Sequence, residues 1–563
     1  DVCSSDLSTS TTNVDASGYD GILTATGSAT ASTFTLKGGA IVHDVTGGAG
    51  GDTFTVAKTT AQQNLDGGAG TDTLNLTLNG TVDADDIANF EVINYAVTDG
   101  TTGVLTTASL AGVNDADATT VNVSGGNSLT TFTHGATTAI GAVNGSQATG
   151  LVTYDLSGYT GLSSSLVFGD DMVDASLTIV GSAGTADTVD ALYDGSSTTI
   201  KSMTGVETFI LRADVTGNQA VDFKNVDGVT KMTVANTTGA GLTTLTDLDA
   251  GVALTFTGAT TEDGLTVDLI NKTDLDNTQT ITLSEVAGAN NDVNINASDI
   301  ETLTLVVKDT TGPHEMDIDL STTAMTTANK TSTVIVTATT VADLIGVNAD
   351  ITTIDASTST AAVKVLAAAR GSDAMTITGG KGDDQIAMES ANDVLSAGEL
   401  TGDDDTLVVA YTSIMSGIQV DLSSTTDQVV SLDNTANSAI QVGFESVDVS
   451  AYANNGAIVL GSDEANTITG TASVDSISAG KGNDFINVAS TAASAGDVMN
   501  GGAGTDTLVI AATTDFADTD ANITNIEKIT VNGTTTLTLT GQTEGFTITG
   551  ASGVQTVIGS AGG

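Results

Sequence analysis

Residues 461–509 read GSDEANTIT at 461, GTASVDSIS at 470 and AGKGNDFIN at 479, then AASAGDVMN at 492 and GGAGTDTLV at 501. These tandem copies share the pattern Gly-Gly-x-Gly-x-Asp-x-U-x, in which U is a large apolar residue. The glycines permit turn conformations that a side chain forbids, and the last three residues form a very short strand whose middle side chain points inward. The inward residues are Ile468, Ile477, Ile486, Met499 and Leu508. Because one copy cannot bury its apolar residue alone, the copies are predicted to stack into an all-β, parallel β-solenoid or β-roll.

Two further islands carry the same nonapeptide. The island at 29–75 contains GGAIVHDVT at 38, GGAGGDTFT at 47 and GGAGTDTLN at 67. The island at 370–408 contains GGKGDDQIA at 379, MESANDVLS at 388 and a copy from 397 to 408 that is stretched by three residues. A single weak copy, GSAGTADTV, begins at 181. The pattern therefore extends well beyond the C-terminal island.

The sixth place of each copy is predicted to supply a metal ligand. Glycine turns leave peptide carbonyls bare, and an Asp at the sixth place adds a carboxylate. Ca²⁺ suits oxygen-only ligands in a flexible loop, because it takes about six to eight oxygens at roughly 2.3 to 2.6 Å. The predicted calcium ligands are Asp52, Asp72, Asp384, Asp393, Asp405, Asp475, Asp484, Asp497 and Asp506. Asn466 predicts an underliganded turn, and the copy at Asp187 is expected to bind poorly.

Composition agrees with a chain that is stabilised by bound metal ions. The sequence has 69 acidic and 14 basic residues, for a formal net charge of −55, so a compact chain repels itself unless cations bind or screen it. Part of this charge is also expected simply to keep the chain soluble. Such charge disfavours nucleic acid as a partner, and no run approaches the roughly 18 apolar residues of a membrane span. Hydrophobic residues make up 39%, which argues against disorder.

A larger imperfect unit repeats along the chain. Asp-x-Ser begins at Asp15, Asp155, Asp355 and Asp448, and an apolar-Glu-x-apolar strand contains Glu91, Glu207, Glu301, Glu445 or Glu527. Both are interpreted as markers of turns and solenoid rungs. The predicted units are 8–150 with the island 29–75, 151–350 with the degenerate copy 181–189, 351–445 with the island 370–408, and 446–563 with the island 461–509. The Ala-rich piece 361–370 is predicted to be strand, by analogy with 457–460.

Both ends are interpreted as non-native. Residues 1–7, DVCSSDL, reverse-translate with one choice of codons into a common sequencing adapter and are interpreted as a library remnant. They contain Cys3, the only cysteine, so no disulfide framework is predicted. Residues 559–563, GSAGG, are interpreted as a truncated further repeat.

No catalytic site is predicted. His43, His134 and His314 are scattered, and His314-Glu315 does not complete an HExxH motif because position 318 is Ile318. A G-x-S-x-G elbow is absent. With no Trp and 3% aromatic residues, a sugar-stacking cleft is not expected either. The chain is predicted not to be an enzyme.

The nonapeptides, the acidity and the Thr-rich strands together resemble RTX (hemolysin-type calcium-binding repeat) surface-layer proteins of Gram-negative bacteria. The diagnostic nonapeptides cover a minority of the chain. The resemblance implies type I secretion, folding in external calcium, and self-association into a lattice on the cell surface that is held on lipopolysaccharide. An anchoring domain and a secretion signal are expected beyond the ends of the sequence.

Two other functions share this fold. The first is a large RTX adhesin, in which a similar solenoid is a cell-surface or biofilm stalk. The second is the calcium-binding portion of a secreted enzyme whose catalytic domain lies elsewhere. Flanking sequence discriminates between them: an Ig-like repeat array indicates the adhesin, whereas an HExxH or G-x-S-x-G domain indicates the enzyme.

Overall fold

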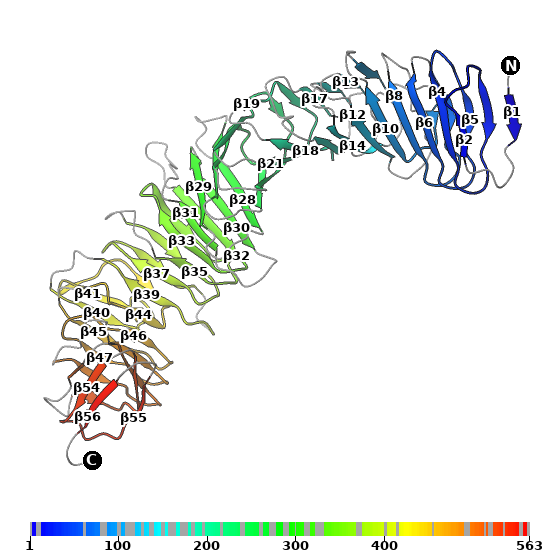
Figure 1. Ribbon diagram of the computed structural model, residues 1–563. Coiled ribbons are helices and arrows are strands. Elements are labelled where there is room, and N and C mark those ends of the chain that lie inside the picture. The colour runs from blue at the N-terminus through cyan, green and yellow to red at the C-terminus, as the bar shows by residue number, and fades with distance from the viewer. Residues whose placement is uncertain are drawn as a thin grey trace. The chain divides into compact units, whose positions relative to one another are not determined.

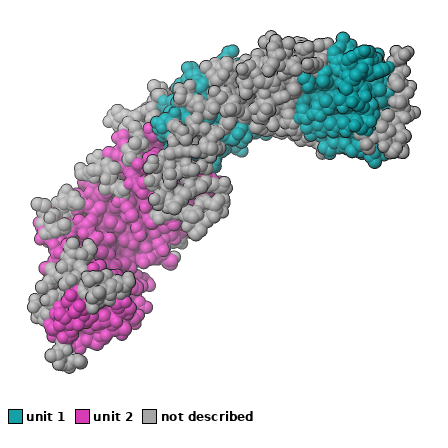
Figure 2. Space-filling view, viewed as in Figure 1, with its two compact units in different colours: residues 1–273 teal, residues 274–563 magenta. Residues whose placement is uncertain are grey.

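The protein is described by a computed structural model in which every regular element is a β-strand and no α-helix occurs among the described residues. The described residues are 3–6, 13–59, 63–78, 87–97, 103–106, 119–124, 129–133, 140–147, 153–155, 165–168, 178–181, 186–193, 198–213, 218–236, 242–257, 263–269, 277–284, 292–298, 300–308, 316–320, 332–366, 374–398, 402–411, 416–452, 455–488, 496–511, 514–515, 522–532, 535–550 and 555–559. The chain forms two compact units, residues 1–273 and 274–563 (Figure 2). The predicted all-β fold is confirmed.

Unit 1 contains four series of parallel-paired strands. The first two are β1 (Cys3–Asp6), β3 (Leu23–Thr26), β5 (Asp44–Thr46), β7 (Asn64–Asp66) and β9 (Ile87–Ala88), and β2 (Asn13–Ala16), β4 (Thr33–Gly39), β6 (Thr53–Thr59), β8 (Thr73–Leu78), β10 (Val92–Val97), β12 (Thr119–Ser124), β14 (Ile140–Gln147), β16 (Ser165–Phe168), β18 (Thr188–Tyr193), β21 (Thr208–Ala213), β24 (Lys231–Asn236) and β26 (Ala253–Thr257). The others are β11 (Gly103–Thr106), β13 (Leu129–Thr133), β15 (Thr153–Asp155), β17 (Thr178–Val180), β20 (Ser202–Thr204) and β23 (Val226–Asp227), and β19 (Thr198–Thr199), β22 (Gln219–Asp222), β25 (Leu242–Leu248) and β27 (Asp263–Leu269).

Unit 2 also contains four series. Three of them are wholly parallel in their described pairings. Two of these three are β28 (Thr278–Ser284), β30 (Thr302–Lys308), β32 (Ser332–Ala338), β34 (Ile351–Asp355), β36 (Thr376–Thr378), β38 (Val394–Ser396) and β43 (Gln441–Val442), and β29 (Asp292–Ser298), β31 (Met316–Leu320), β33 (Ala342–Val347), β35 (Val363–Val365), β37 (Gln385–Met388), β39 (Thr406–Val409), β44 (Ser446–Asp448), β46 (Thr467–Thr469), β48 (Phe485–Val488), β50 (Thr507–Ile510), β53 (Lys528–Val531) and β55 (Thr547–Gly550). The others are β40 (Ile418–Asp421), β41 (Val429–Leu432), β42 (Thr435–Ala436), β45 (Ala457–Leu460), β47 (Ser476–Ser478), β49 (Val498–Asn500) and β52 (Ile523–Thr524), and β51 (Thr514–Asp515), β54 (Thr535–Leu539) and β56 (Gln555–Gly559).

Each unit is a parallel β-solenoid, because a strand pairs with the strand one coil later in the same series (Figure 1). Two nonapeptides make one coil, so alternate copies stack. Ile468 of β46 pairs with Ile486 of β48, which pairs in turn with Leu508 of β50. Ile477 of β47 pairs with Met499 of β49 in the other series. The predicted stacking of the copies is therefore confirmed at the level of register.

The core is the stack of inward side chains between the strand series. All five residues that the sequence places inward in the C-terminal island are at most 2% exposed. The longer strands follow a period of two, as in β30, where Leu303, Leu305 and Val307 are buried between less buried neighbours. This alternation explains the Thr-rich composition, because a β-branched polar residue suits the outer position of a half-buried strand.

A hairpin in unit 2 departs from the predicted parallel pattern. Strand β40 pairs antiparallel with β41, and β41 pairs antiparallel with β42. Strand β40 also pairs in parallel with β45, so the hairpin extends one series of the solenoid. The nonapeptide pattern is absent from 411–445, and the prediction of uniform parallel coils missed this excursion because it rested on that pattern.

The Asp-x-Ser segments at Asp15, Asp355 and Asp448 form turns, as predicted, whereas Ser157 of the segment at Asp155 lies outside the described residues. Asp355 Oδ1 accepts a hydrogen bond from the Ser357 N–H at 3.0 Å, and Asp448 Oδ1 accepts one from Ser450 at 2.8 Å. The side chain thus mimics a backbone turn. Of the piece 361–370, residues 363–365 are the strand β35, while 367–370 lie outside the described residues. Residues 182–185 of the weak copy and 560–563 of the truncated copy also lie outside them. The four predicted unit boundaries stay a prediction.

Candidate metal centre

All nine predicted ligand residues are buried, with at most 3% of their surface exposed. Each lies in the turn that precedes a strand, so stacking of the coils places them in columns. The unit 1 column is Asp52, Asp72 and Glu91, and the unit 2 column is Asp384, Asp405, Glu445, Asn466, Asp484, Asp506 and Glu527. Asp393, Asp475 and Asp497 precede β38, β47 and β49 in the other series of unit 2. The structure therefore brings residues together that are far apart in the sequence.

One oxygen of each column carboxylate holds two coils together. The Asp52 N–H donates to Asp72 Oδ1 at 2.6 Å, and the Asp484 N–H donates to Asp506 Oδ1 at 2.9 Å. On the other side of unit 2, the Asp475 N–H donates in the same way to Asp497 Oδ1, at 2.8 Å. Hydrogen bonds from a backbone amide to a carboxylate are stronger than neutral ones. The sixth-place residue is therefore structural, which the sequence alone did not indicate.

The Glu strands belong to the same columns. Each Glu lies one coil after an acidic or amide residue. Its Oε2 accepts a hydrogen bond from the backbone N–H of that residue. The pairs are Asp72 to Glu91 at 2.6 Å, Asp187 to Glu207 at 2.8 Å, Asn277 to Glu301 at 2.8 Å, Asp405 to Glu445 at 3.0 Å, and Asp506 to Glu527 at 2.8 Å. Sequence reasoning identified these strands as rungs but missed the role of the carboxylate. The recurrence of Glu after the last Asp of an island was the available signal.

The second carboxylate oxygen divides eight of the nine predicted ligands, all except Asp497, into two kinds of rung. In closed rungs, Oδ2 accepts an N–H from the second place of its own turn. Gly48 donates to Asp52 at 2.6 Å, and Gly380 donates to Asp384 at 2.5 Å. Asp393 and Asp475 are closed in the same way, by the N–H groups of Glu389 and Thr471. A closed carboxylate has both oxygens bonded within the protein.

In open rungs, Oδ2 is buried and has no hydrogen-bond partner among the described residues. The open rungs are Asp72, Asp405, Asp484 and Asp506. Their second-place glycines have positive φ values: 96° at Gly68, 125° at Gly398, 107° at Gly480 and 97° at Gly502. No positive φ occurs at the second place of the closed rungs. We attribute the open state to this backbone conformation, which turns the second-place N–H away from the carboxylate.

Glycine is required in the open rungs because successive turns lie in contact. A Cβ added at Gly480 would lie 2.1 Å from the Ser462 carbonyl oxygen, and one at Gly502 would lie 1.9 Å from that of Gly480. The expectation of bare carbonyls is wrong at these positions. Ser462 O accepts the Lys481 N–H at 3.0 Å, and Gly480 O accepts the Ala503 N–H at 2.8 Å. Each carbonyl keeps a second lone pair.

Burial raises the pKa of the open carboxyls, and it also raises that of the closed Asp384 to about 6 and that of the closed Asp475 above its usual value. Desolvation raises the pKa of Asp72 and of Asp484 to about 6 and that of Asp405 to about 8, with neighbouring carboxylates adding to the shift. Desolvation also raises the pKa of Glu445 to about 7 and that of Asp506 above its usual value. A buried ionised oxygen without a donor is unfavourable, so each open rung requires a proton or a cation. Oxygen-only donors fit a hard cation such as Ca²⁺.

The opposite series of unit 1 shows the same arrangement without charge. His43 stands at the sixth place of GGAIVHDVT, and its Nδ1 accepts the Leu23 N–H at 3.2 Å. The His43 N–H donates in turn to Gln63 Oε1 at 3.2 Å. Neutral acceptors therefore suffice to hold coils together, and the carboxylates of the acidic columns carry a charge that coil stacking does not need.

One group of three carboxylates stands out. Asp403, Asp405 and Glu445 each place a carboxylate oxygen within 4.8 Å of the others, and no other group of at least three such ligands is this close within the part of the chain that the structure describes. Only Asp405 of these three was predicted from the nonapeptide.

Comparison with known proteins adds no relative. No protein-family model matches the chain, and neither a curated protein nor a solved structure matches it. The functional proposal therefore depends on the columns themselves.

Exchanging Asp for Asn is expected to have opposite effects in the two kinds of rung. Asp484→Asn removes an unpaired buried charge, so in EDTA it should raise the free energy of unfolding by about 1 to 3 kcal/mol, while one Ca²⁺ is lost. Asp52→Asn turns an amide N–H₂ toward the Gly48 N–H and should destabilise the chain. Far-UV circular dichroism in EDTA, which reports the fraction of β structure that persists without calcium, and calcium titration by calorimetry measure both. Unchanged calcium stoichiometry in Asp484→Asn would contradict the assignment.

Proposed function

We propose that this protein is a structural, calcium-binding extracellular protein that assembles into a bacterial surface layer and has no catalytic activity. The observation that carries the calcium part is the set of four buried, unpartnered carboxylate oxygens at Asp72, Asp405, Asp484 and Asp506. These four residues would hold the ions, and the ions would supply the positive charge that the columns lack. The resemblance of the nonapeptides to RTX repeats supports the same conclusion.

The assembly part depends on the solenoid and the charge. A solenoid presents similar surfaces at successive coils, which suits periodic contacts, and contacts that do not close on themselves produce extended arrays. With a net charge of −55, neighbouring copies repel unless cations bridge them. We propose that Ca²⁺ acts both inside the columns and between copies, with lipopolysaccharide as the support and type I secretion as the route of export.

A membrane-spanning helix is not part of this proposal. In the described residues the structure contains no helix with the length and apolar character needed to cross a bilayer.

Electron microscopy of the purified chain during calcium titration tests the assembly. We expect ordered two-dimensional arrays to form as Ca²⁺ rises, and to dissolve in EDTA. The variant Asp484→Asn, Asp506→Asn is the control, since it lowers the need for internal ions and keeps the surface carboxylates, so its arrays should still require Ca²⁺. Isolated monomers at every calcium concentration would contradict the surface layer and favour the adhesin stalk.

A further inference from the structure

The group Asp403, Asp405 and Glu445 lies where the hairpin excursion returns to the solenoid. Asp403 and Asp405 precede β39, and Glu445 precedes β44, the next strand of the same series. The hairpin β40–β42 lies between them in the sequence. The group therefore joins the two sides of the excursion.

The backbone fixes Glu445 against the Asp405 turn. The Asp405 N–H donates to Glu445 Oε2 at 3.0 Å, and the Glu445 N–H donates back to the Asp405 carbonyl at 3.1 Å. Next to this pair, the Ser446 hydroxyl bonds Asp404 Oδ1 at 2.5 Å. The position of Glu445 thus follows from strand pairing and does not depend on a flexible side chain alone.

A second observation shows that the group needs a positive counter-charge, which is a cation or, when no cation is present, a proton. Asp405 is fully buried, and its Oδ2 has no hydrogen-bond partner among the described residues. Three carboxylates within 4.8 Å of one another repel when ionised, and burial strengthens the repulsion. A hard divalent cation satisfies the unpaired oxygen and the repulsion together.

We propose that Asp403, Asp405 and Glu445 form a divalent-cation site of the Ca²⁺ class that fastens the hairpin excursion to the solenoid. The site differs from a nonapeptide site, because Asp403 and Glu445 both lie outside the sixth place of any copy. This proposal rests on the proposed calcium-dependent function. It assigns a bound cation to Asp403 and Glu445, which the nonapeptide pattern leaves unexplained.

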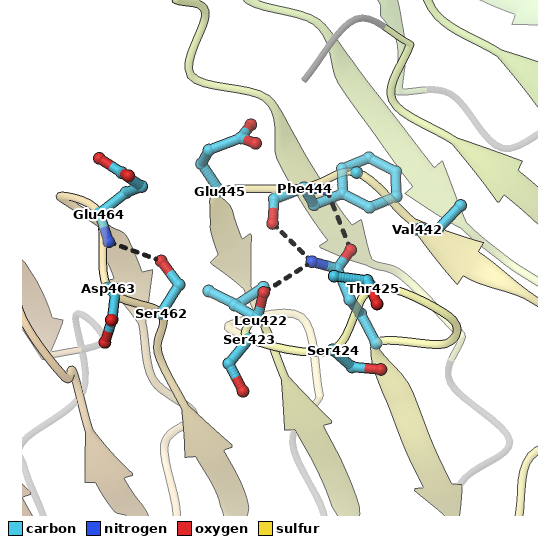
Figure 3. A pocket seen from close by; sticks show the side chains of 12 residues that line it. Leu422, Ser423, Ser424, Thr425, Val442, Phe444, Glu445, Ser462, Asp463 and Glu464 are labelled. Carbon is cyan, nitrogen blue, oxygen red and sulfur yellow. Dashed lines mark hydrogen bonds between the residues drawn. The ribbon is translucent and has the colours of Figure 1, made fainter. Parts of the chain in front are cut away.

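The site is coupled to the hairpin through the residue before Glu445. Gln428, next to β41, donates from Nε2 to the Phe444 carbonyl at 2.7 Å and accepts the Phe444 N–H at 2.9 Å (Figure 3). Its Nε2 also donates to the Leu422 carbonyl at 3.0 Å. Glu445 lines the same pocket, between the hairpin and the turn at Ser462 (Figure 3). A cation that fixes Glu445 therefore also limits the opening of the hairpin.

Calorimetric titration of the full chain with Ca²⁺ tests the site. Glu445→Gln and Asp403→Asn should each bind one ion fewer than the parent. Glu301→Gln is the matched control, because Glu301 plays the same backbone role toward the uncharged Asn277, at 2.8 Å. It should keep the parent stoichiometry.

Hydrogen exchange supplies a local readout that does not depend on counting ions. In saturating Ca²⁺, exchange in 418–444 should be at least tenfold faster in Asp403→Asn than in the parent and in Glu301→Gln. If both site variants bind as many ions as the parent, the site is wrong. If the parent itself binds no Ca²⁺, the proposed calcium-binding function is contradicted. Failure of the site and failure of the proposed function therefore give different results.

Discussion

Removing Ca²⁺ from the full chain with EDTA is expected to abolish most of its β structure, and millimolar Ca²⁺ is expected to restore it. At a free concentration tenfold above Kd, each site contributes about 1.4 kcal/mol to stability. Four open rungs then contribute roughly 6 kcal/mol, which is comparable with the whole stability of an ordinary domain, about 5 to 15 kcal/mol. Far-UV circular dichroism before and after chelation measures the change.

Mg²⁺ at the same concentration is the control. It demands a tighter octahedron than stacked turns offer, so it should restore little structure. The column of unit 1 that contains His43 and Gln63 should not hold the fold alone. Chelation removes the cations from the acidic columns of both units at once and leaves their carboxylates without positive charge. An unchanged β spectrum after exhaustive chelation would contradict calcium-dependent folding.

The stability of the chain should depend on pH with opposite signs in the two metal states. In EDTA the folded pKa values are about 6 for Asp72, Asp384 and Asp484, about 7 for Glu445 and about 8 for Asp405, whereas an unfolded Asp or Glu has a pKa of about 4. Between those values the folded chain holds protons that the unfolded chain releases. Stability is therefore gained as pH falls from about 8 toward 4 and is lost as pH rises through the folded values.

With saturating Ca²⁺ the slope should reverse, because protons compete with the ions for the same oxygens. Far-UV circular dichroism in EDTA between pH 5 and 8 measures the recovery of β structure as pH falls, and thermal denaturation in Ca²⁺ over the same range measures the opposite slope. Asp484→Asn should reduce the slope in EDTA, since it removes one of the titrating groups. Slopes of the same sign in both conditions would show that the open rungs are not the shared site of protons and ions.

The coil and its register were predictable from sequence because they follow from a local pattern. The nonapeptide places Ile486 two residues after Asp484. Stacking of tandem copies therefore buries Ile486 in the core and aligns Asp484 with the other members of its column. The choice between open and closed rungs was not predictable. Gly48 and Gly68 both stand at second place, yet only Gly68 has a positive φ.

The residues outside the pattern were missed for a related reason. Glu445 reaches its column only because β44 pairs with β39 across the hairpin. That pairing skips the whole excursion. The Glu-strand pattern marked Glu445 as part of a rung, but it did not show that this rung stacks on Asp405. The group with Asp403 is a product of topology, which the nonapeptide does not describe.

Pairing each strand with the strand one coil later has a kinetic consequence. Because paired strands are only one coil apart in the sequence, the contact order is low. Folding can therefore nucleate in one island and extend coil by coil while the remainder of the chain is still unfolded. Most coils close loops of similar length to one another. At the hairpin, the bond from Asp405 to Glu445 spans 40 residues, about double the usual coil, which adds about 0.6 kcal/mol of closure entropy. Folding that proceeds coil by coil should therefore pause at the hairpin, and cation binding to Asp403, Asp405 and Glu445 would set the length of the pause.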